Sequence, residues 1–262
     1  MENWRNIKKL SKKILVLADL HVGSKYALMP KQFNGYLAQK AQLKILEEWN
    51  NMCKRERKID YLIIDGDIVD GKAKASDGKD VWTTDVDTQI EAAMELVKQI
   101  DYDKLLVAYG SPYHTEENRN ADESFAKEMH AVSHGYELSF QPNSCRDIIH
   151  ISHMIGVSAA SWQYRTTPLA KELVAALLNE HALYKYKCII RAHAHYYCTV
   201  AFSSFGFITP CWQTRTPYMI RKGLSLVPKL GYVRLNVEDE RLSHGGMEAH
   251  TFDMPRDVLV NA

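Results

Sequence analysis

Carboxylates and histidines recur at the ends of apolar segments in this chain. The first pair follows the short apolar run 14–18, where Asp19 and His21 are separated by one residue. In an extended backbone successive side chains alternate between faces, so these two side chains are expected to point the same way. An oxygen and a nitrogen donor side by side are typical ligands of a transition metal. A strand that runs into a polar loop can contain the same two residues, so this pair alone does not establish a metal site.

Four further apolar segments end in the same kinds of residue. The side chains concerned are Asp67 and Asp70, then His114, then His153, and finally His193 with His195. Because ligands collect at the carboxyl ends of the strands in open α/β sheets, we expect these groups to converge at one edge. Their number and order predict a site for metal ions or phosphate.

Amphipathic segments separate the predicted strands. Apolar residues recur at three- and four-residue spacing through Phe33, Leu37, Ala41, Ile45, Trp49 and Met52. This period predicts a helix that packs one face on a sheet. Further helices are predicted near 90–97, 121–132 and 169–183, and short strands follow residue 197. We expect one domain over residues 1–262, with two packed sheets and helices on the outside.

The overall composition is that of an ordinary globular protein, with 46% hydrophobic residues, 25% charged residues and a net charge of +1. This charge predicts no general attraction to nucleic acid or membranes. No apolar run approaches the roughly 18 residues of a membrane span. The five cysteines are scattered and form no C-x-x-C pair, which favours reduced thiols in an intracellular protein. We therefore expect a cytoplasmic protein that does not contact membranes.

The ordered motifs resemble those of the calcineurin-like metallophosphoesterases, namely D-x-H, G-D-x-x-D, G-N-H-[DE], a lone H and G-H-x-H. In this chain they read Asp19-Leu20-His21, Gly66-Asp67-Ile68-Val69-Asp70, the segment Gly110–His114, His153, and Ala192-His193-Ala194-His195. The resemblance extends from residue 14 to about residue 217. It implies an α/β fold, a four-layer αββα sandwich of two packed mixed sheets flanked by helices, with two metals at the sheet edge.

The resemblance also implies a role for each motif residue. Asp19, His21 and His195 would hold one divalent ion, His153 and His193 would hold the other, and Asp67 would bridge the two. Asp70 would lie behind a ligand histidine and fix its tautomer through the ring N–H. Oxygen and nitrogen ligands without thiolates admit Mn, Fe, Zn, Ni or Co, of which we favour Mn.

Charge supports a phosphoester substrate. The positive charge of two divalent ions exceeds the negative charge of the two ligand carboxylates. The surplus positive charge suits an anionic ester. A metal-bound hydroxide, which exists at neutral pH because the ion lowers the pKa of its water, would attack phosphorus. The sequence therefore predicts a binuclear, metal-dependent phosphoester hydrolase.

The third motif departs from the family pattern. It reads Gly110-Ser111-Pro112-Tyr113-His114, so the usual asparagine ligand of the second ion is absent. His114 can replace this ligand, or it can bind the phosphate and protonate the leaving group. We favour the second role. Ser111 and Asn118 are weaker candidates for the missing ligand.

Two arginines are candidates for substrate binding through bidentate contacts with phosphate. Arg165 and Arg215 lie in loops that also contain Trp162 and Trp212. Such loops could form a rim that contacts bases, although packing in the core is the more frequent role of such tryptophans. The basic residues between positions 5 and 13 are a further candidate for attracting phosphates.

These features favour a phosphodiesterase or nuclease that acts on nucleic acid. The alternative within the same class is a phosphomonoesterase or protein phosphatase, since the metal core would be the same. An alternative of another class is a metal-stabilised binding protein without catalysis, which the altered third motif suggests. The sequence leaves the natural substrate, the metal identity and the oligomeric state open.

Overall fold

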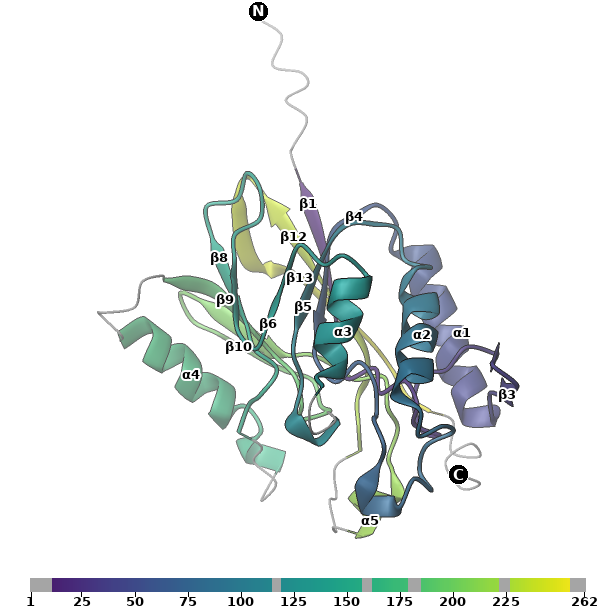
Figure 1. The fold of residues 1–262 in the computed structure, drawn as a ribbon. Helices are drawn as coiled ribbons and strands as arrows, with labels where there is room; N and C mark the ends of the chain where they lie inside the picture. Colours follow the sequence, from purple (N-terminus) through teal and green to yellow (C-terminus); the bar gives the residue numbers. More distant parts are fainter. Residues whose placement is uncertain (1–10, 115–118, 157–161, 179–184, 222–226, 255–262) are drawn as a thin grey trace, which may run out of the picture.

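Two β-sheets lie face to face in the computed structural model, which describes residues 11–114, 119–156, 162–178, 185–221 and 227–254 (Figure 1). The first sheet has six strands in the order β13 (Arg241–Phe252), β12 (Leu230–Glu238), β1 (Lys12–Ala18), β4 (Ile59–Asp65), β5 (Tyr102–Ala108) and β6 (Ser133–Gly135). The second has five strands in the order β10 (Cys198–Ala201), β11 (Phe205–Ile208), β9 (Tyr186–Arg191), β8 (Ile148–Ile151) and β7 (Leu138–Phe140). Both sheets mix parallel and antiparallel pairs.

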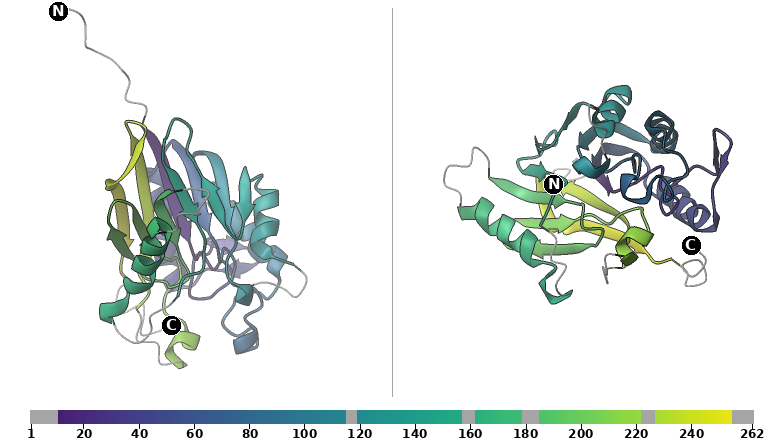
Figure 2. Two further views of the ribbon diagram at one scale, coloured as in Figure 1. Left: turned by 90° about the vertical axis from the view of Figure 1, so that its left-hand side faces the viewer. Right: turned by 60° about the horizontal axis from the view of Figure 1, so that its bottom comes forward.

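Helices cover the outer face of each sheet (Figures 1 and 2). The six-stranded sheet carries α1 (Lys40–Arg55), α2 (Val86–Val97) and α3 (Ala121–Glu128), and the five-stranded sheet carries α4 (Thr167–Leu178). A short helix, α5 (Pro217–Arg221), lies apart from these layers. The predicted four-layer αββα sandwich is therefore confirmed. Among the described residues, no helix is both long and apolar enough to cross a membrane.

The alternation of side chains along β1 explains why this strand is apolar throughout. Ile14 and Val16 face the second sheet, where they join the core between the sheets. Leu15 and Leu17 face the opposite way and pack under the helices. A strand that is buried on both faces needs apolar residues at every position.

The parallel pairing of the central strands aligns their ends. Ala18 of β1 lies beside Asp65 of β4, which lies beside Ala108 of β5. In the second sheet β8 and β9 are also parallel. The loops that follow these strands therefore emerge at one edge of the sandwich, at the lower side of Figure 1.

The first predicted helix is shorter than its apolar pattern indicated. Phe33 and Leu37 lie in a small hairpin, formed by β2 (Gln32–Phe33) and β3 (Tyr36–Leu37), and α1 begins only at Lys40. The hairpin turns at Asn34 and Gly35, whose φ angles are 45° and 85°. An Asn-Gly pair favours such a two-residue turn, and this local signal outweighs the helical spacing of the apolar residues.

Candidate metal centre

The loops at this edge hold several predicted site residues in an unusual backbone conformation. Positive φ angles occur at Asp19 (51°), His21 (46°), Asp67 (49°), His193 (66°) and His195 (54°). This left-handed region is uncommon for residues other than glycine, and such strain is found preferentially at functional sites. β1 ends at Ala18, so the expectation that extended backbone aligns Asp19 with His21 is wrong. The turns, and not the strand, direct both side chains to the same place.

One cluster forms around the carboxylate of Asp19. Its Oδ1 lies 3.3 Å from Nε2 of His195, 3.7 Å from Nε2 of His153 and 3.8 Å from Nε2 of His21. Asp19 is fully buried, and this oxygen has no hydrogen-bond partner among the described residues. A buried carboxylate oxygen faced by three ring nitrogens is an arrangement that fits a metal ion.

The orientation of His21 leads to the same conclusion. Its Nδ1 donates to Oδ1 of Asp70 at 3.0 Å, which leaves Nε2 as the atom without a hydrogen in the neutral ring. That Nε2 lies 3.1 Å from Nε2 of His195. Two ring nitrogens directed at each other need a proton or a metal ion between them. Gln213 supports Asp70 from behind, because its Nε2 donates to Asp70 Oδ1 at 3.1 Å.

A second cluster contains Asp67, His153 and His193, whose candidate ligand atoms lie within 4.8 Å of one another. Nε2 of His153 is 3.1 Å from Oδ2 of Asp67. Nδ1 of His153 donates to the backbone oxygen of Asp65 at 2.6 Å, so Nε2 is again available for a metal. The backbone N–H of His193 donates to Oδ2 of Asp19 at 3.2 Å and so links the two clusters.

His114 lies beside both clusters. Its Nδ1 donates to the backbone oxygen of Asp70 at 2.9 Å, and its Nε2 is 3.8 Å from Oδ2 of Asp67. With His21 and Asp67 it forms a third group that could hold an ion. This geometry is compatible with both of the roles considered for His114.

The electrostatics of the clusters also suit cations. Burial alone would raise the pKa of Asp19, but His195 and His153 hold it below its ordinary value. Burial alone would lower the pKa of His21, but its contacts with Asp19 and Asp70 raise it to about 10. In the metal-free polypeptide, raised pKa values of His21 and His153 favour protons on these two rings, which offset the charge of the carboxylates. A metal ion would take the place of those protons.

Asp122 was not recognised from the sequence as a residue of the site. Its buried carboxylate accepts the backbone N–H groups of Asp67 at 3.1 Å, Ile68 at 3.0 Å and Gly110 at 2.7 Å. Asp122 belongs to α3, where the side chain of Asn120 caps the first turn. It therefore joins the loops that follow β4 and β5. An acidic residue in the first turn of a helix is common, so the sequence pattern gave no sign of this role.

Ser111 contacts Asp67 directly. Its backbone N–H donates to Asp67 Oδ1 at 2.6 Å, and its hydroxyl donates to Oδ2 at 3.2 Å. The approach of these loops requires glycine at two positions. A Cβ on Gly66, where φ is 73°, would lie 2.4 Å from His153 Nδ1, and one on Gly110 would lie 2.2 Å from the backbone nitrogen of Asp67.

Asp65 is a second residue that sequence reasoning missed. It ends β4, is fully buried, and neither carboxylate oxygen has a partner among the described residues. Burial raises the pKa of Asp65 to about 7, so its protonated, neutral form is populated at higher pH than that of an ordinary aspartate. Its contribution to the site is the backbone oxygen that orients His153.

The candidate substrate residues are two arginines. The guanidinium of Arg165 sits 4.9 Å above the ring of Tyr196, and Arg215 is exposed just before α5. Trp212 is fully buried and packs against Trp49, so it belongs to the core and not to a rim. Asn118 and most of the basic segment 5–13 fall outside the described residues.

Comparison with known families agrees with this geometry. Residues 12–110 match the family model described as calcineurin-like phosphoesterase. The matched range runs from β1 to Gly110 and includes the first two motifs with Asp19, His21, Asp67 and Asp70. No curated protein matches the sequence. The family match, over the N-terminal part of the chain, agrees with the calcineurin-like phosphoesterase superfamily and supports a metal-dependent hydrolase of phosphoesters.

Several solved structures align with most of the chain. An archaeal phosphodiesterase is 9% identical, with a TM-score of 0.45 and coverage of 92% of this chain and 99% of that one. A metallophosphoesterase from Sphaerobacter thermophilus is 11% identical, with a TM-score of 0.42 and coverage of 93% and 89%. A 5′-nucleotidase precursor from Thermus thermophilus is 9% identical, with a TM-score of 0.45 and coverage of 96% and 57%. Because these TM-scores lie below 0.5, none of these activities is transferred to this chain.

Proposed function

We propose that this chain is a binuclear metal-dependent phosphodiesterase. Asp19, His21 and His195 would hold one divalent ion, His153 and His193 would hold the other, and Asp67 would lie between them. The observation that carries this proposal is Oδ1 of Asp19, which is buried, unpartnered among the described residues and faced by the Nε2 atoms of three histidines. The ligand set of oxygen and nitrogen atoms favours Mn, with Fe, Zn, Ni and Co as alternatives.

Bound divalent ions would supply Lewis acidity and a nucleophilic water near neutral pH. The chain's own residues complete the site. Asp70 holds His21 in one tautomer, and Asp65 does the same for His153 through its backbone oxygen. The backbone oxygen of Asp70 can only accept, so Nδ1 of His114 keeps its hydrogen and Nε2 is the atom that exchanges a proton. This supports a role for His114 as the proton donor to the leaving oxygen.

The preference for a diester, and within diesters for nucleic acid, is supported by aromatic surface near the His21 loop. The backbone N–H of Trp82 donates to the oxygen of Gly23 at 2.8 Å, two residues after His21. The ring of Tyr36 lies 5.0 Å from that of Trp82, and Tyr36 is 41% exposed. A second ester substituent that carries a base could stack on this surface. Arg165 and Arg215 remain our candidates for contacts with phosphate.

We further propose that residues 1–262 form a single domain. The observation in favour is that the late strands β12 and β13 extend the sheet that β1 begins.

A cytoplasmic location is proposed from the cysteines. All five are free thiols, three of them buried, as expected for a protein in a reducing compartment.

The test is hydrolysis of bis-p-nitrophenyl phosphate and p-nitrophenyl phosphate by the same preparation with added Mn²⁺. A higher kcat/KM for the diester is expected. A higher kcat/KM for the monoester would favour a phosphomonoesterase or protein phosphatase. Activity on neither ester, with metal content measured and saturated, would favour a binding protein without catalysis. Metal content close to one ion per chain at saturation would contradict the binuclear site.

A further inference from the structure

A glutamine lies on the buried face of α2, where a helix that packs on a sheet is expected to carry apolar residues. Gln89 is fully buried, as are Ala93 and Leu96, which follow it on the same face at four- and seven-residue spacing. A buried amide costs stability unless its N–H groups and its oxygen find partners. The partners of Gln89 therefore indicate why an amide occupies this position.

The hydrogen bonds of Gln89 go to the backbone of the segment that follows Asp70. Its Oε1 accepts the N–H of Gly71 at 2.9 Å, and its Nε2 donates to the oxygens of Gly71 at 2.9 Å and Thr83 at 2.7 Å. Both amide hydrogens are used and the amide oxygen faces an N–H, so the side chain fits in one orientation only. Gln89 thus binds both backbone polar groups of Gly71, as a neighbouring β-strand would.

The same amide contacts the loop that follows His21. A Cβ on Gly23, where φ is 115°, would lie 2.2 Å from Cδ of Gln89, so only glycine leaves room for the amide. The two loops are joined beside it, because the backbone N–H of Asp70 donates to the oxygen of Val22 at 2.9 Å. Gln89 therefore lies at the junction of the His21 loop and the Asp70 loop.

Asp70, which precedes Gly71, orients two histidines of the candidate metal centre. Its Oδ1 accepts from Nδ1 of His21 at 3.0 Å, and its backbone oxygen accepts from Nδ1 of His114 at 2.9 Å. Gly71 itself packs against His114, since a Cβ on Gly71 would lie 2.9 Å from the backbone oxygen of His114. A displacement of Gly71 would therefore change the direction of both imidazoles.

From these contacts we propose that Gln89 is a positioning residue of the metal centre. It fixes Gly71, and through Asp70 it sets the directions in which the Nε2 atoms of His21 and His114 point. The inference rests on the function proposed above for these two histidines. Groups that orient metal-binding histidines typically contribute about 10–100-fold to metal affinity or activity, and Gln89 orients the group that does so.

The experiment compares Gln89→Met with the wild type. Methionine has a similar length and volume but lacks the amide, so the hydrogen bonds to Gly71 and Thr83 are lost while the space stays filled. In the metal-free protein, NMR should show the backbone N–H of Asp70 exchanging with solvent at least about tenfold faster, because the loop opens more readily.

The metal-loaded protein gives a second readout. In Gln89→Met the affinity for Mn²⁺ should fall by at least about tenfold. Hydrolysis of an alkyl phosphodiester should fall by about 10²-fold, because a proton donor that is misplaced by about 1 Å loses much of its effect. A nitrophenyl ester should lose less, since its leaving group needs no proton.

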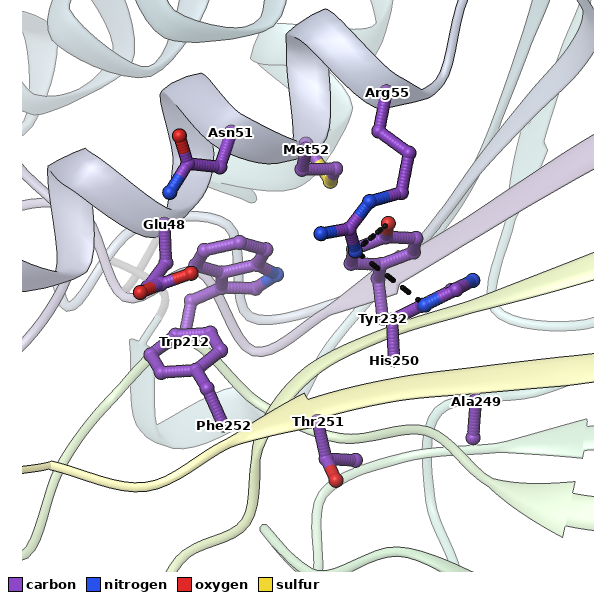
Figure 3. Close-up of a pocket in the computed structure, with 10 residues that line it drawn as sticks. All are labelled: Glu48, Asn51, Met52, Arg55, Trp212, Tyr232, Ala249, His250, Thr251 and Phe252. Carbon is purple, nitrogen blue, oxygen red and sulfur yellow. Dashed lines mark hydrogen bonds between the residues drawn. The ribbon is translucent and has the colours of Figure 1, made fainter.

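Two variants separate positioning from a general loss of stability. Leu96→Ala leaves a cavity on the same face of α2 and should lower the free energy of unfolding, with metal affinity and the ratio of ester rates unchanged. Arg55→Met removes hydrogen bonds from α1 to Tyr232 at 3.2 Å and to His250 at 3.4 Å, beside a cavity that none of the proposed metal ligands lines (Figure 3). It should leave exchange at Asp70, metal affinity and the ratio of rates as in the wild type.

Exchange at Asp70 as slow in Gln89→Met as in the wild type would overturn the inference, whether or not the protein is active. Unchanged metal affinity with an unchanged ratio of rates, and stability lowered as in Leu96→Ala, would reduce Gln89 to a residue of the fold and would also overturn it. If the wild type hydrolyses neither ester, the function proposed above fails. Faster exchange at Asp70 together with weaker metal binding would still support the role of Gln89.

Discussion

Nδ1 of His114 donates a hydrogen bond of 2.9 Å to the backbone oxygen of Asp70. The carbonyl oxygen is an acceptor in every protonation state of the site, so the opposite ring nitrogen is the one that can bind a metal or exchange a proton. That nitrogen lies 3.8 Å from Oδ2 of Asp67. The two roles left open for His114 therefore differ in what Nε2 contacts, and they predict different consequences of its removal.

His114→Ala tests these roles. If His114 protonates the leaving oxygen, the variant should keep its metal and lose activity by about 10²–10⁴-fold on an alkyl ester. A nitrophenyl ester, whose leaving group needs no proton, should lose far less. The measurement is metal content together with the ratio of the two rates. The exposed His134 provides the control variant His134→Ala. An unchanged ratio with one ion lost would show that His114 is a metal ligand.

Asp67→Asn tests the bridging carboxylate. The change removes a negative charge from a residue that belongs to two of the groups able to hold an ion. We expect metal affinity to fall by more than about tenfold and activity to be lost, while the fold is retained. Elemental analysis and circular dichroism measure both effects. Asp77→Asn, at an exposed aspartate of the following loop, should change neither. Full turnover with unchanged metal content would mean that another residue bridges.

Asp122→Asn tests the acceptor that joins the loops after β4 and β5. An amide retains one acceptor oxygen but directs its NH₂ group at one or two of the three backbone donors. We expect a loss of about 1–3 kcal/mol in the free energy of unfolding, and weaker metal binding because the loop of Asp67 is released. Urea unfolding and metal titration provide the two readouts. In the same helix turn, Glu123→Gln should be nearly neutral, since the ion pair of Glu123 is with the exposed Lys127. Equal effects of the two changes would refute the positioning role.

His150 predicts a dependence of stability on pH that is independent of the proposed ligands. Burial lowers the pKa of His150 below its ordinary value of 6.5, against the raising effect of Glu137. As pH falls through 6.5 the unfolded chain takes up a proton that the folded chain does not. The contribution of His150 to the free energy of unfolding should therefore fall toward acid pH, by up to about 1.4 kcal/mol for each pH unit between the two pKa values.

The comparison is urea unfolding at about pH 7.5 and about pH 5.5, on either side of the ordinary histidine pKa, with a chelator present. His150→Gln should lose less stability between these values than the wild type, because the titrating group is gone. His134→Gln, at an exposed histidine, should follow the wild type. A pH dependence that His150→Gln leaves intact would assign it to other groups.

The sequence was sufficient to predict the central strands of both sheets and the edge at which they end, but not the short strands β2, β3, β6 and β7. Runs such as 14–18 are apolar at every position because both faces are buried, and this signal survives in any buried parallel strand. The sequence also predicted which side chains would meet. Asp19, His21 and His195 lie together in the structure, as do Asp67, His153 and His193.

The means by which these side chains meet was not predictable from spacing. Asp19 and His21 converge through turns with left-handed backbone conformation. Glycine is the only residue type that predicts such a conformation reliably from sequence. The role of Asp122 depends on a contact between α3 and two loops that are distant in sequence. Likewise, Phe33 and Leu37 followed a helical period by chance, while the Asn34-Gly35 turn decided their structure.

The pairing of β1 with β12 has a consequence for synthesis of the chain. Lys12 lies opposite Val237, so β1 is hydrogen-bonded on one side by a strand that is synthesised much later. Until the ribosome has released residues 230–238, β1 presents an open, apolar edge to other nascent chains. Contacts that span so much of the chain slow folding. We therefore expect shortened products that stop before β12 to associate with one another or with chaperones, although they contain every proposed metal ligand.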